Sequence, residues 1–241
     1  MKATSIEFRF RFVIICIIFA LGFWAPWNMA LHLDSVRTWQ AIAAWIYRHG
    51  WLSFITATDA VLYFGIGLAI LSAWLRTWGS AYLGVSVVQD SAMHGDRIVA
   101  AGPYLYLRNP LYLGLLLHSM ALALLMPPSG AIVCVVLIAL FQLRLIAAEE
   151  AFLTAQLGAP YLAYKAAVPS QIPALSPRFP ASAVKPAWAM AFLSEIYMWG
   201  VVVSFATLGL RYNAVLILQG VLVSLGVSIV VRGLLPKKKG L

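Results

Sequence analysis

Two short polar clusters stand out in an otherwise apolar chain. The first covers residues 102–114 and reads Gly-Pro-Tyr-Leu-Tyr-Leu-Arg-Asn-Pro-Leu-Tyr-Leu-Gly, just before an apolar run. The second is the adjacent acidic pair Glu149 and Glu150, to which that run leads. The free amides and positive dipole end of a helix start favour a carboxylate or phosphate ligand. We therefore interpret the first cluster as one half of a ligand site.

The first cluster contains a strong helix start at Asn109 and Pro110. Asn can cap the free amides, and Pro at the first helical position loses no hydrogen bond. This local role is complete without any ligand. It does not explain why further polar side chains gather around the same point, namely Tyr104, Tyr106, Arg108 and Tyr112.

The acidic pair follows a polar residue on the same predicted helix. Gln142 and Glu149 are seven residues apart and project from nearly the same face, while Glu150 lies about a fifth to a third of a turn away. A solvated helix end is the alternative explanation. Acids near a helix C-terminus are disfavoured by the dipole unless the helix continues or a cation is bound.

The composition indicates an integral membrane protein. Hydrophobic residues make up 63% of the chain and charged residues 10%, whereas about 25% are charged in soluble domains. The net charge of +9 is scattered between apolar spans or gathered at the termini, which favours membrane orientation over nucleic-acid binding. Cys16 and Cys134 lie in apolar runs without neighbouring ligands, so neither a disulfide nor a metal site is expected.

The apolar runs predict an all-α, polytopic bundle of about six transmembrane helices. A span needs about 20 apolar residues. The predicted spans are residues 12–30, 54–75, 110–126, 130–147, 188–210 and 214–231. The third and fourth form a hairpin, because Pro127-Pro128-Ser129-Gly130 is a tight break between two helices.

The orientation follows from the Lys and Arg residues, which are enriched in cytoplasmic loops. If the N-terminus is inside, all of the 17 Lys and Arg residues except Arg37, Arg48 and Arg211 fall on the inner side. Both termini and the 102–114 cluster are therefore predicted to be cytoplasmic. Between the first two spans, a short helix on the outer surface is predicted from the spacing of Trp39 and Ala43.

Three regions follow from this layout. Residues 1–95 form an N-terminal two-span region, residues 96–175 a core of a helical hairpin plus a cytoplasmic helix, and residues 176–241 a linker and a C-terminal two-span hairpin. The fourth span is expected to continue through residues 147–157, which are good helix formers, and to stop at Gly158, Pro160 and Pro169.

The ordered combination of motifs over residues 96–173 resembles the isoprenylcysteine carboxyl methyltransferase and phospholipid methyltransferase family. The motifs are the 102–114 pattern, the proline-broken hairpin, Glu149-Glu150, Leu157-Gly158, Tyr161, Tyr164 and Val168-Pro169. The resemblance implies a membrane-embedded enzyme with S-adenosylmethionine in a cytoplasmic pocket between the hairpin and the cytoplasmic helix. The family pattern ends soon after the second motif, so the last two spans lie outside it.

Carried over to this chain, the resemblance implies a set of site residues. Arg108, Asn109 and Glu150 are the catalytic candidates. The candidates for cofactor binding are Tyr104, Tyr106, Arg108, Tyr112, Gly114, Gln142, Glu149, Glu150, Tyr161 and Tyr164. The eukaryotic prenylcysteine enzymes have His where this chain has Asn109, and Asn does not titrate near pH 7.

The acceptor is left open by the sequence. The implied acceptors are lipophilic and arrive from the bilayer: the carboxylate of an isoprenylated cysteine, which needs no general base, or a phospholipid amine, for which Glu149 or Glu150 is the candidate base. Alternative functions are a membrane reductase of the sterol type that uses NADPH, and a transporter or scaffold without enzymatic activity. Further ionisable candidates for a functional role are Asp59, His94, His118 and Glu195, because ionisable residues inside a membrane are costly.

Overall fold

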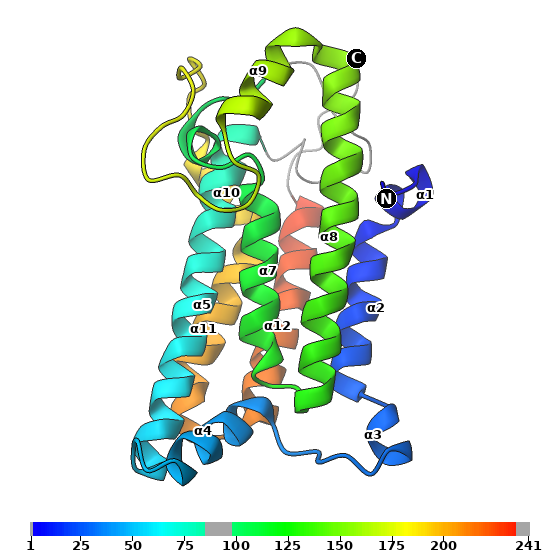
Figure 1. Cartoon of the computed structure of the whole chain (residues 1–241). Coiled ribbons are helices and arrows are strands. Elements are labelled where there is room, and N and C mark those ends of the chain that lie inside the picture. The colour runs from blue at the N-terminus through cyan, green and yellow to red at the C-terminus, as the bar shows by residue number, and fades with distance from the viewer. Residues whose placement is uncertain (1, 85–97, 235–241) are drawn as a thin grey trace.

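A computed structural model describes residues 2–84 and 98–234, and this part of the chain is all-helical. His94, Arg97, Lys237 to Lys239 and the predicted boundary at residues 95–96 lie outside the described residues. The elements are α1 (Ser5–Arg9), α2 (Arg11–Trp24), α3 (Trp27–Ala30), α4 (Thr38–Arg48), α5 (Phe54–Leu83), η1 (Gly102–Leu105), α7 (Pro110–Ala123), α8 (Pro128–Leu157), α9 (Ala159–Ala167), α10 (Trp188–Ser194), α11 (Ile196–Leu208), η2 (Gly209–Arg211) and α12 (Ala214–Leu234). The long helices form an upright bundle, with α9 at one end and α4 at the other (Figure 1).

The predicted class of an all-helical membrane bundle is confirmed. Four segments are long and apolar enough to cross a membrane: Arg11–Ala30, Phe54–Leu83, Pro128–Leu157 and Ala214–Val231. A fifth consists of α10 and the helix after it, which are bent by 65° at a short break. The structure thus supports four or five spans where about six were expected, because α7 has only 14 residues.

The short helix α7 is completed by α4, which lies across its end. The amides of Thr38 and Trp39 donate to the carbonyl oxygens of Met126 and Leu124, at 2.8 and 3.0 Å. These carbonyls follow the last turn of α7 and have no partner within that helix. The predicted short helix between the first two spans is confirmed as α4, with Trp39 and Ala43 buried.

The hairpin of α7 and α8 is confirmed, and α2 packs closely against its second helix. A Cβ added to Gly130 of α8 would clash with the carbonyl oxygen of Gly22 on α2. Small residues at membrane-helix interfaces let two backbones approach in this way. The contact fixes α2 alongside α8.

Helix α8 continues beyond the apolar run, as predicted, and has 30 residues in all. It ends at Gly158, whose φ of 60° is readily adopted by glycine. The chain then reverses into α9, so Pro160 belongs to the first turn of a new helix as well as marking the end of the old one. Helix α9 ends before Pro169, as expected.

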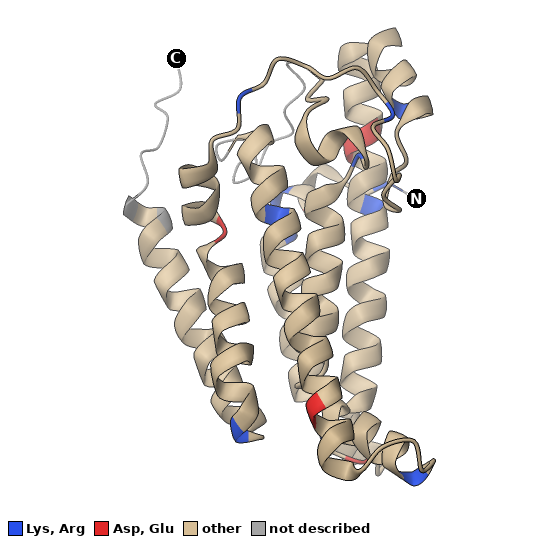
Figure 2. Ribbon diagram, turned by 90° about the vertical axis from the view of Figure 1, so that its left-hand side faces the viewer, with Lys and Arg blue, Asp and Glu red and all other residues tan. Residues whose placement is uncertain are grey.

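An extended connector after α9 runs beside residues 100–108. The amides of Arg178 and Ser182 donate to the carbonyl oxygens of Leu105 and Ala100, at 2.9 and 2.7 Å. The connector therefore lies against the 102–114 cluster. Charged residues lie mostly toward the two ends of the bundle (Figure 2). Helix α1 lies toward the end that carries α9 (Figure 1).

Candidate active site

An ion pair joins the two predicted motifs. Arg108 precedes α7 and Glu150 lies near the end of α8, and the antiparallel hairpin brings them together. The Nη2 atom of Arg108 lies 2.8 Å from Oε1 of Glu150, and Nε donates to the same oxygen at 3.0 Å. Lys165 of α9 completes the cluster, with Nζ 2.9 Å from the other oxygen, Oε2. Both oxygens of Glu150 are therefore occupied by cations.

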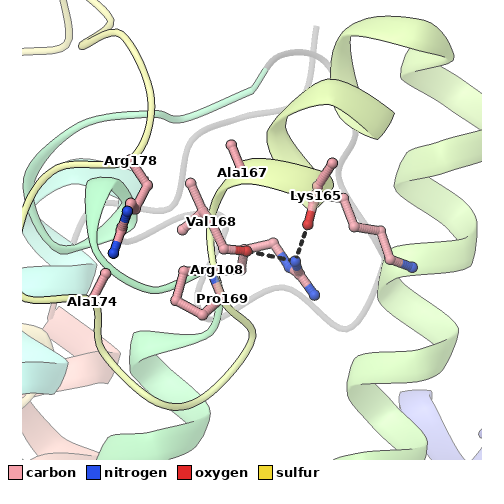
Figure 3. A pocket seen from close by; sticks show the side chains of 8 residues that line it. Arg108, Lys165, Ala167, Val168, Pro169, Ala174 and Arg178 are labelled. Atoms are coloured by element: carbon pink, nitrogen blue, oxygen red, sulfur yellow. Dashed lines mark hydrogen bonds between the residues drawn. The ribbon is translucent and has the colours of Figure 1, made fainter.

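The remaining donors of Arg108 bind the backbone at the end of α9. Its Nη1 atom donates to the carbonyl oxygen of Val168 at 2.6 Å and also to that of Lys165 (Figure 3). Carbonyls in the last turn of a helix lack partners within it, and an arginine is suited to bind them. Arg108 thus holds α7, α8 and α9 together.

A second contact between the hairpin helices lies beside this cluster. The Oη atom of Tyr112 on α7 donates to Oε2 of Glu149 on α8 at 3.0 Å. The adjacent glutamates therefore have different partners, since Glu150 binds two cations and Glu149 a phenol. The sequence predicted that both belong to one site without distinguishing their surroundings.

Buried tyrosines connect η1 with α9. The Oη atom of Tyr164 donates to the carbonyl oxygen of Tyr104 at 2.8 Å, and the ring of Tyr161 lies 6.0 Å from that of Tyr164. Burial raises the pKa of Tyr104, Tyr161 and Tyr164 above the usual value of 10. These phenols are therefore neutral hydrogen-bond donors at physiological pH.

Two of the predicted binding residues carry buried polar atoms with no partner in the described part of the chain. They are the hydroxyl of Tyr104 and both side-chain polar atoms of Gln142, a residue only 1% exposed. Buried polar groups are nearly always hydrogen-bonded, so each exception calls for a reason. A bound polar ligand is one such reason, and it would have to reach each of the two side chains.

A surface pocket of about 370 Å³ opens beside Arg108, lined also by Lys165, Ala166, Ala167, Val168, Pro169, Ala174 and Arg178. Figure 3 shows Arg178 on the opposite side of this pocket from Lys165. Arg108 and Lys165 share the negative charge of Glu150, so with Arg178 the lining has more positive than negative charge, which favours an anionic group. A second pocket of about 320 Å³ shares Ala174 and is mainly apolar, with Leu75, Trp78, Pro103, Tyr106, Leu107, Pro173 and Leu175 as its other lining residues.

The remaining predicted residues have the following contacts in the structure, and only the capping role expected of Asn109 is wrong. The side chain of Asn109 does not cap α7, because its Nδ2 atom instead donates to Oγ and the carbonyl oxygen of Ser170, at 3.0 and 3.2 Å. Gly114 faces α5, where its carbonyl oxygen accepts a 2.8 Å bond from Ser72. Tyr106 lines the apolar pocket. Lys165, Ser170 and Arg178 were not among the predicted site residues.

Comparison with known protein families connects this geometry with a function. Residues 60–159 match the phospholipid methyltransferase family. The resemblance predicted from the motifs is confirmed over this phospholipid methyltransferase region, which runs from α5 to the start of α9 and contains Arg108, Tyr112, Glu149 and Glu150. No match was found among curated proteins or among solved structures.

The phospholipid methyltransferase match indicates a membrane methyltransferase, and the side chains present are suited to S-adenosylmethionine. Glutamates can bind its ammonium group or ribose hydroxyls, and arginines its carboxylate. Tyrosine rings attract a sulfonium through their faces. The unpartnered atoms of Tyr104 and Gln142 offer further hydrogen bonds. The donor set therefore fits this cofactor.

Proposed function

We propose that this protein is a membrane methyltransferase that uses S-adenosylmethionine and transfers the methyl group to a lipophilic acceptor. The observation that carries the proposal is the Arg108–Glu150 contact, which unites both predicted motifs within the phospholipid methyltransferase region. The family match favours this function over a sterol-type reductase, a transporter or a scaffold.

The site residues divide by charge into two groups. Arg108, Lys165 and Arg178 line the first pocket and are suited to an anionic group such as the cofactor carboxylate. Glu149, Gln142 and the buried tyrosines are suited to its ammonium group, hydroxyls and sulfonium. When bound, the cofactor supplies a methyl group already activated on sulfur. The protein then has to orient the acceptor and exclude water, which lowers the barrier by several kcal/mol in favourable cases, on the order of 7 or more.

The two proposed acceptor classes place different demands on Glu149 and Glu150. A carboxylate acceptor attacks the methyl carbon without losing a proton. An amine must release one, and Glu149 is the better placed base, because both oxygens of Glu150 are held by Arg108 and Lys165. Tyr112 orients Glu149 through its 3.0 Å hydrogen bond.

The second, apolar pocket supports a lipophilic acceptor. Its hydrophobic lining includes Leu75, Trp78 and Leu175, and it adjoins the basic pocket at Ala174. A molecule with a polar head and an apolar chain would match such a pair of neighbouring pockets. We also propose that both termini and the site are cytoplasmic, from the distribution of Lys and Arg.

Calorimetry in detergent tests the cofactor assignment. S-adenosylmethionine and S-adenosylhomocysteine should bind to the wild-type protein and not to Arg108→Ala or Glu150→Ala. Arg211→Ala is the matched control, since Arg211 is exposed at the far end of the bundle. Binding of a nicotinamide dinucleotide in place of both compounds would support the reductase instead, and a radiolabelled-methyl assay with prenylcysteine and phospholipid acceptors would separate the two acceptor classes.

A further inference from the structure

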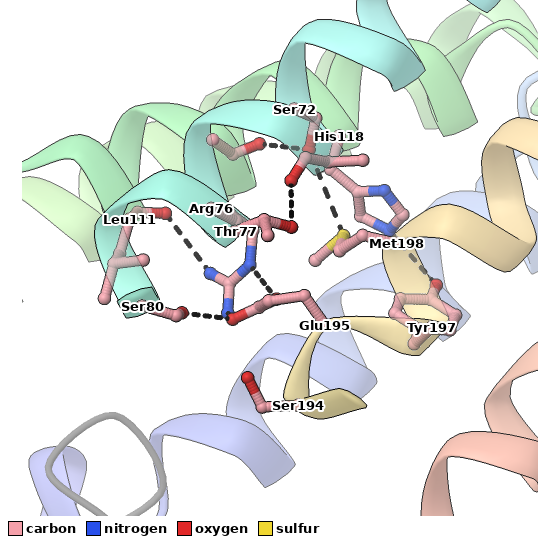
Figure 4. Close-up of polar contacts among 12 residues, drawn as sticks. Ser72, Arg76, Thr77, Ser80, Leu111, His118, Ser194, Glu195, Tyr197 and Met198 are labelled. Atoms are coloured by element: carbon pink, nitrogen blue, oxygen red, sulfur yellow. Dashed lines mark hydrogen bonds and ion pairs between the residues drawn. The ribbon is translucent and has the colours of Figure 1, made fainter. Parts of the chain in front are cut away.

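A buried ion pair lies inside the bundle, and neither of its residues lines the two pockets described above. Arg76 of α5 meets Glu195, which lies between α10 and α11 and is 2% exposed. Nε and Nη2 of Arg76 lie 2.7 and 3.0 Å from Oε2 and Oε1 of Glu195, and Oγ of Ser80 donates to Oε1 at 2.8 Å (Figure 4). Charges within a membrane are costly and are kept where they have a function or a partner.

Glu195 coincides with the sharp bend in the C-terminal hairpin. Helices α10 and α11 are bent by 65° around it. Sharp kinks usually occur at Pro or Gly, but residues 188–199 contain neither. The bend lies at Glu195, whose side chain binds Arg76 on α5. A second bond to α5 runs from Nε1 of Trp199 to Oγ1 of Thr77, at 3.0 Å.

Arg76 also contacts the first turns of α7. Its Nη1 atom donates to the carbonyl oxygen of Leu111 at 3.3 Å. A Cβ on Gly114 would lie only 2.5 Å from Cγ of Arg76, so the glycine leaves room for the arginine to lie along α7. The same turns carry Tyr112, which binds Glu149. One guanidinium thus connects the C-terminal hairpin with the helix that carries a proposed site residue.

We propose that Arg76 and Glu195 are a positioning pair for the methyltransferase site. Glu195 lies outside residues 60–159, so the C-terminal hairpin supplies the acidic partner of Arg76 from beyond the matched region. By holding the Arg76 guanidinium, Glu195 keeps it against Leu111 and so fixes the start of α7 and the direction of Tyr112. This role for the hairpin rests on the proposed function above.

The alternative is that the pair only holds two helices together, and Glu195→Gln separates the two roles. The Glu195→Gln substitution retains the shape of the side chain but removes the negative charge that orients Arg76. We expect S-adenosylhomocysteine to bind at least about tenfold more weakly, because small displacements of binding groups have effects of this size. Hydrogen–deuterium exchange should be faster in peptides that contain residues 110–114. The control is Val201→Ala, a buried position on α11, which should lower the melting temperature but leave the affinity unchanged.

The charge-reversed double variant Arg76→Glu/Glu195→Arg gives a second readout. It should recover part of the melting temperature lost in Glu195→Gln, but not the affinity, because no guanidinium on α5 then reaches Leu111. Unchanged affinity and exchange in Glu195→Gln would overturn the proposal, as would an equal loss of affinity in Val201→Ala. If the wild-type protein binds neither S-adenosyl compound, the proposed function fails, and the exchange of residues 110–114 alone decides whether the pair fixes α7.

Discussion

The Arg108 guanidinium and the Glu150 carboxylate lie 2.8 Å apart, although 42 residues separate them in the chain. Each side chain is 11% exposed, so the contact is largely removed from water. Removing Glu150 leaves the Arg108 charge without its acidic partner, and removing Arg108 leaves Glu150 with Lys165 alone. Either loss in a buried cluster is more costly than losing a surface ion pair.

We therefore expect Arg108→Ala and Glu150→Ala each to lower the free energy of unfolding by about 3 kcal/mol. The double variant should lose less than the sum of the single variants, with a coupling energy on the order of 1–3 kcal/mol. Thermal denaturation in detergent measures these changes. Additive effects would show that the two side chains do not interact, whereas Arg211→Ala should be close to neutral.

Gln142→Met is expected to affect stability and binding in opposite directions. The side chain is 1% exposed, and its two polar atoms have no partner among residues 2–84 and 98–234. An apolar residue of similar shape therefore removes the cost of burying these atoms without hydrogen bonds. The cofactor-free protein should become more stable by about 1–2 kcal/mol. Binding of S-adenosylhomocysteine should weaken, because the proposed hydrogen bonds are lost. A less stable variant with unchanged affinity would contradict both expectations.

Tyr112→Phe removes the hydrogen bond to Glu149 and leaves the ring in place. We expect binding of S-adenosylhomocysteine to weaken by about tenfold, since a hydrogen bond to a charged group contributes about 1.5–3 kcal/mol. If the acceptor is an amine, kcat should fall as well, because Glu149 is no longer oriented. Tyr63→Phe is the matched control: Tyr63 is 59% exposed on α5, and its replacement should leave both quantities unchanged.

The N-terminal helix α1 should detach from α8 in acid. A hydrogen bond from the Thr4 amide and one from Arg144 lower the pKa of Glu7 below its usual value of 4.5. Because the pKa is lower in the folded state, the unfolded state binds more protons between the two pKa values. The ionised Glu7 therefore stabilises the folded state above pH 4.5, and this stabilisation is lost as the pH falls through the pKa of the folded state.

Hydrogen–deuterium exchange of residues 3–9 between pH 6 and pH 3, corrected for the intrinsic rate, would follow this release. In Glu7→Gln the corrected exchange should be fast at every pH and nearly independent of it. Protection that persists at pH 3 in the wild-type protein would show that the contact with Arg144 does not hold α1.

The sequence predicted that the two motifs belong to one site, and the hairpin explains why they lie close together. A proline-containing break at residues 127–130 makes α7 and α8 antiparallel, so Arg108 and the Glu149–Glu150 pair must lie at the same end. Helical periodicity predicted that Gln142, Glu149 and Glu150 line one side of the end of α8. Local rules of this kind were sufficient to predict the class of fold and the end of the bundle at which the two motifs meet.

Contacts that depend on the connector were not predictable in this way. Ser170 and Arg178 reach the site because the segment after α9 folds back beside residues 100–108, and its prolines indicate an extended chain without giving its direction. Lys165 reaches Glu150 because the chain reverses at Gly158 into α9. Asn109 likewise binds Ser170 where capping was expected. The break at Glu195 has no local signal, since its carboxylate binds α5.

Helix α8 is longer than the hydrocarbon layer of a membrane is thick. A helix of 30 residues is about 45 Å long, whereas the hydrocarbon layer is about 30 Å thick. The last turns, with Glu149 and Glu150, therefore stand at or above the water interface when the apolar part is fully immersed. Thicker bilayers would draw these glutamates toward the acyl chains, and thinner ones would lift them into water. Lipid chain length thus becomes a means of tuning how deeply this end of the helix is immersed, without any change in the protein.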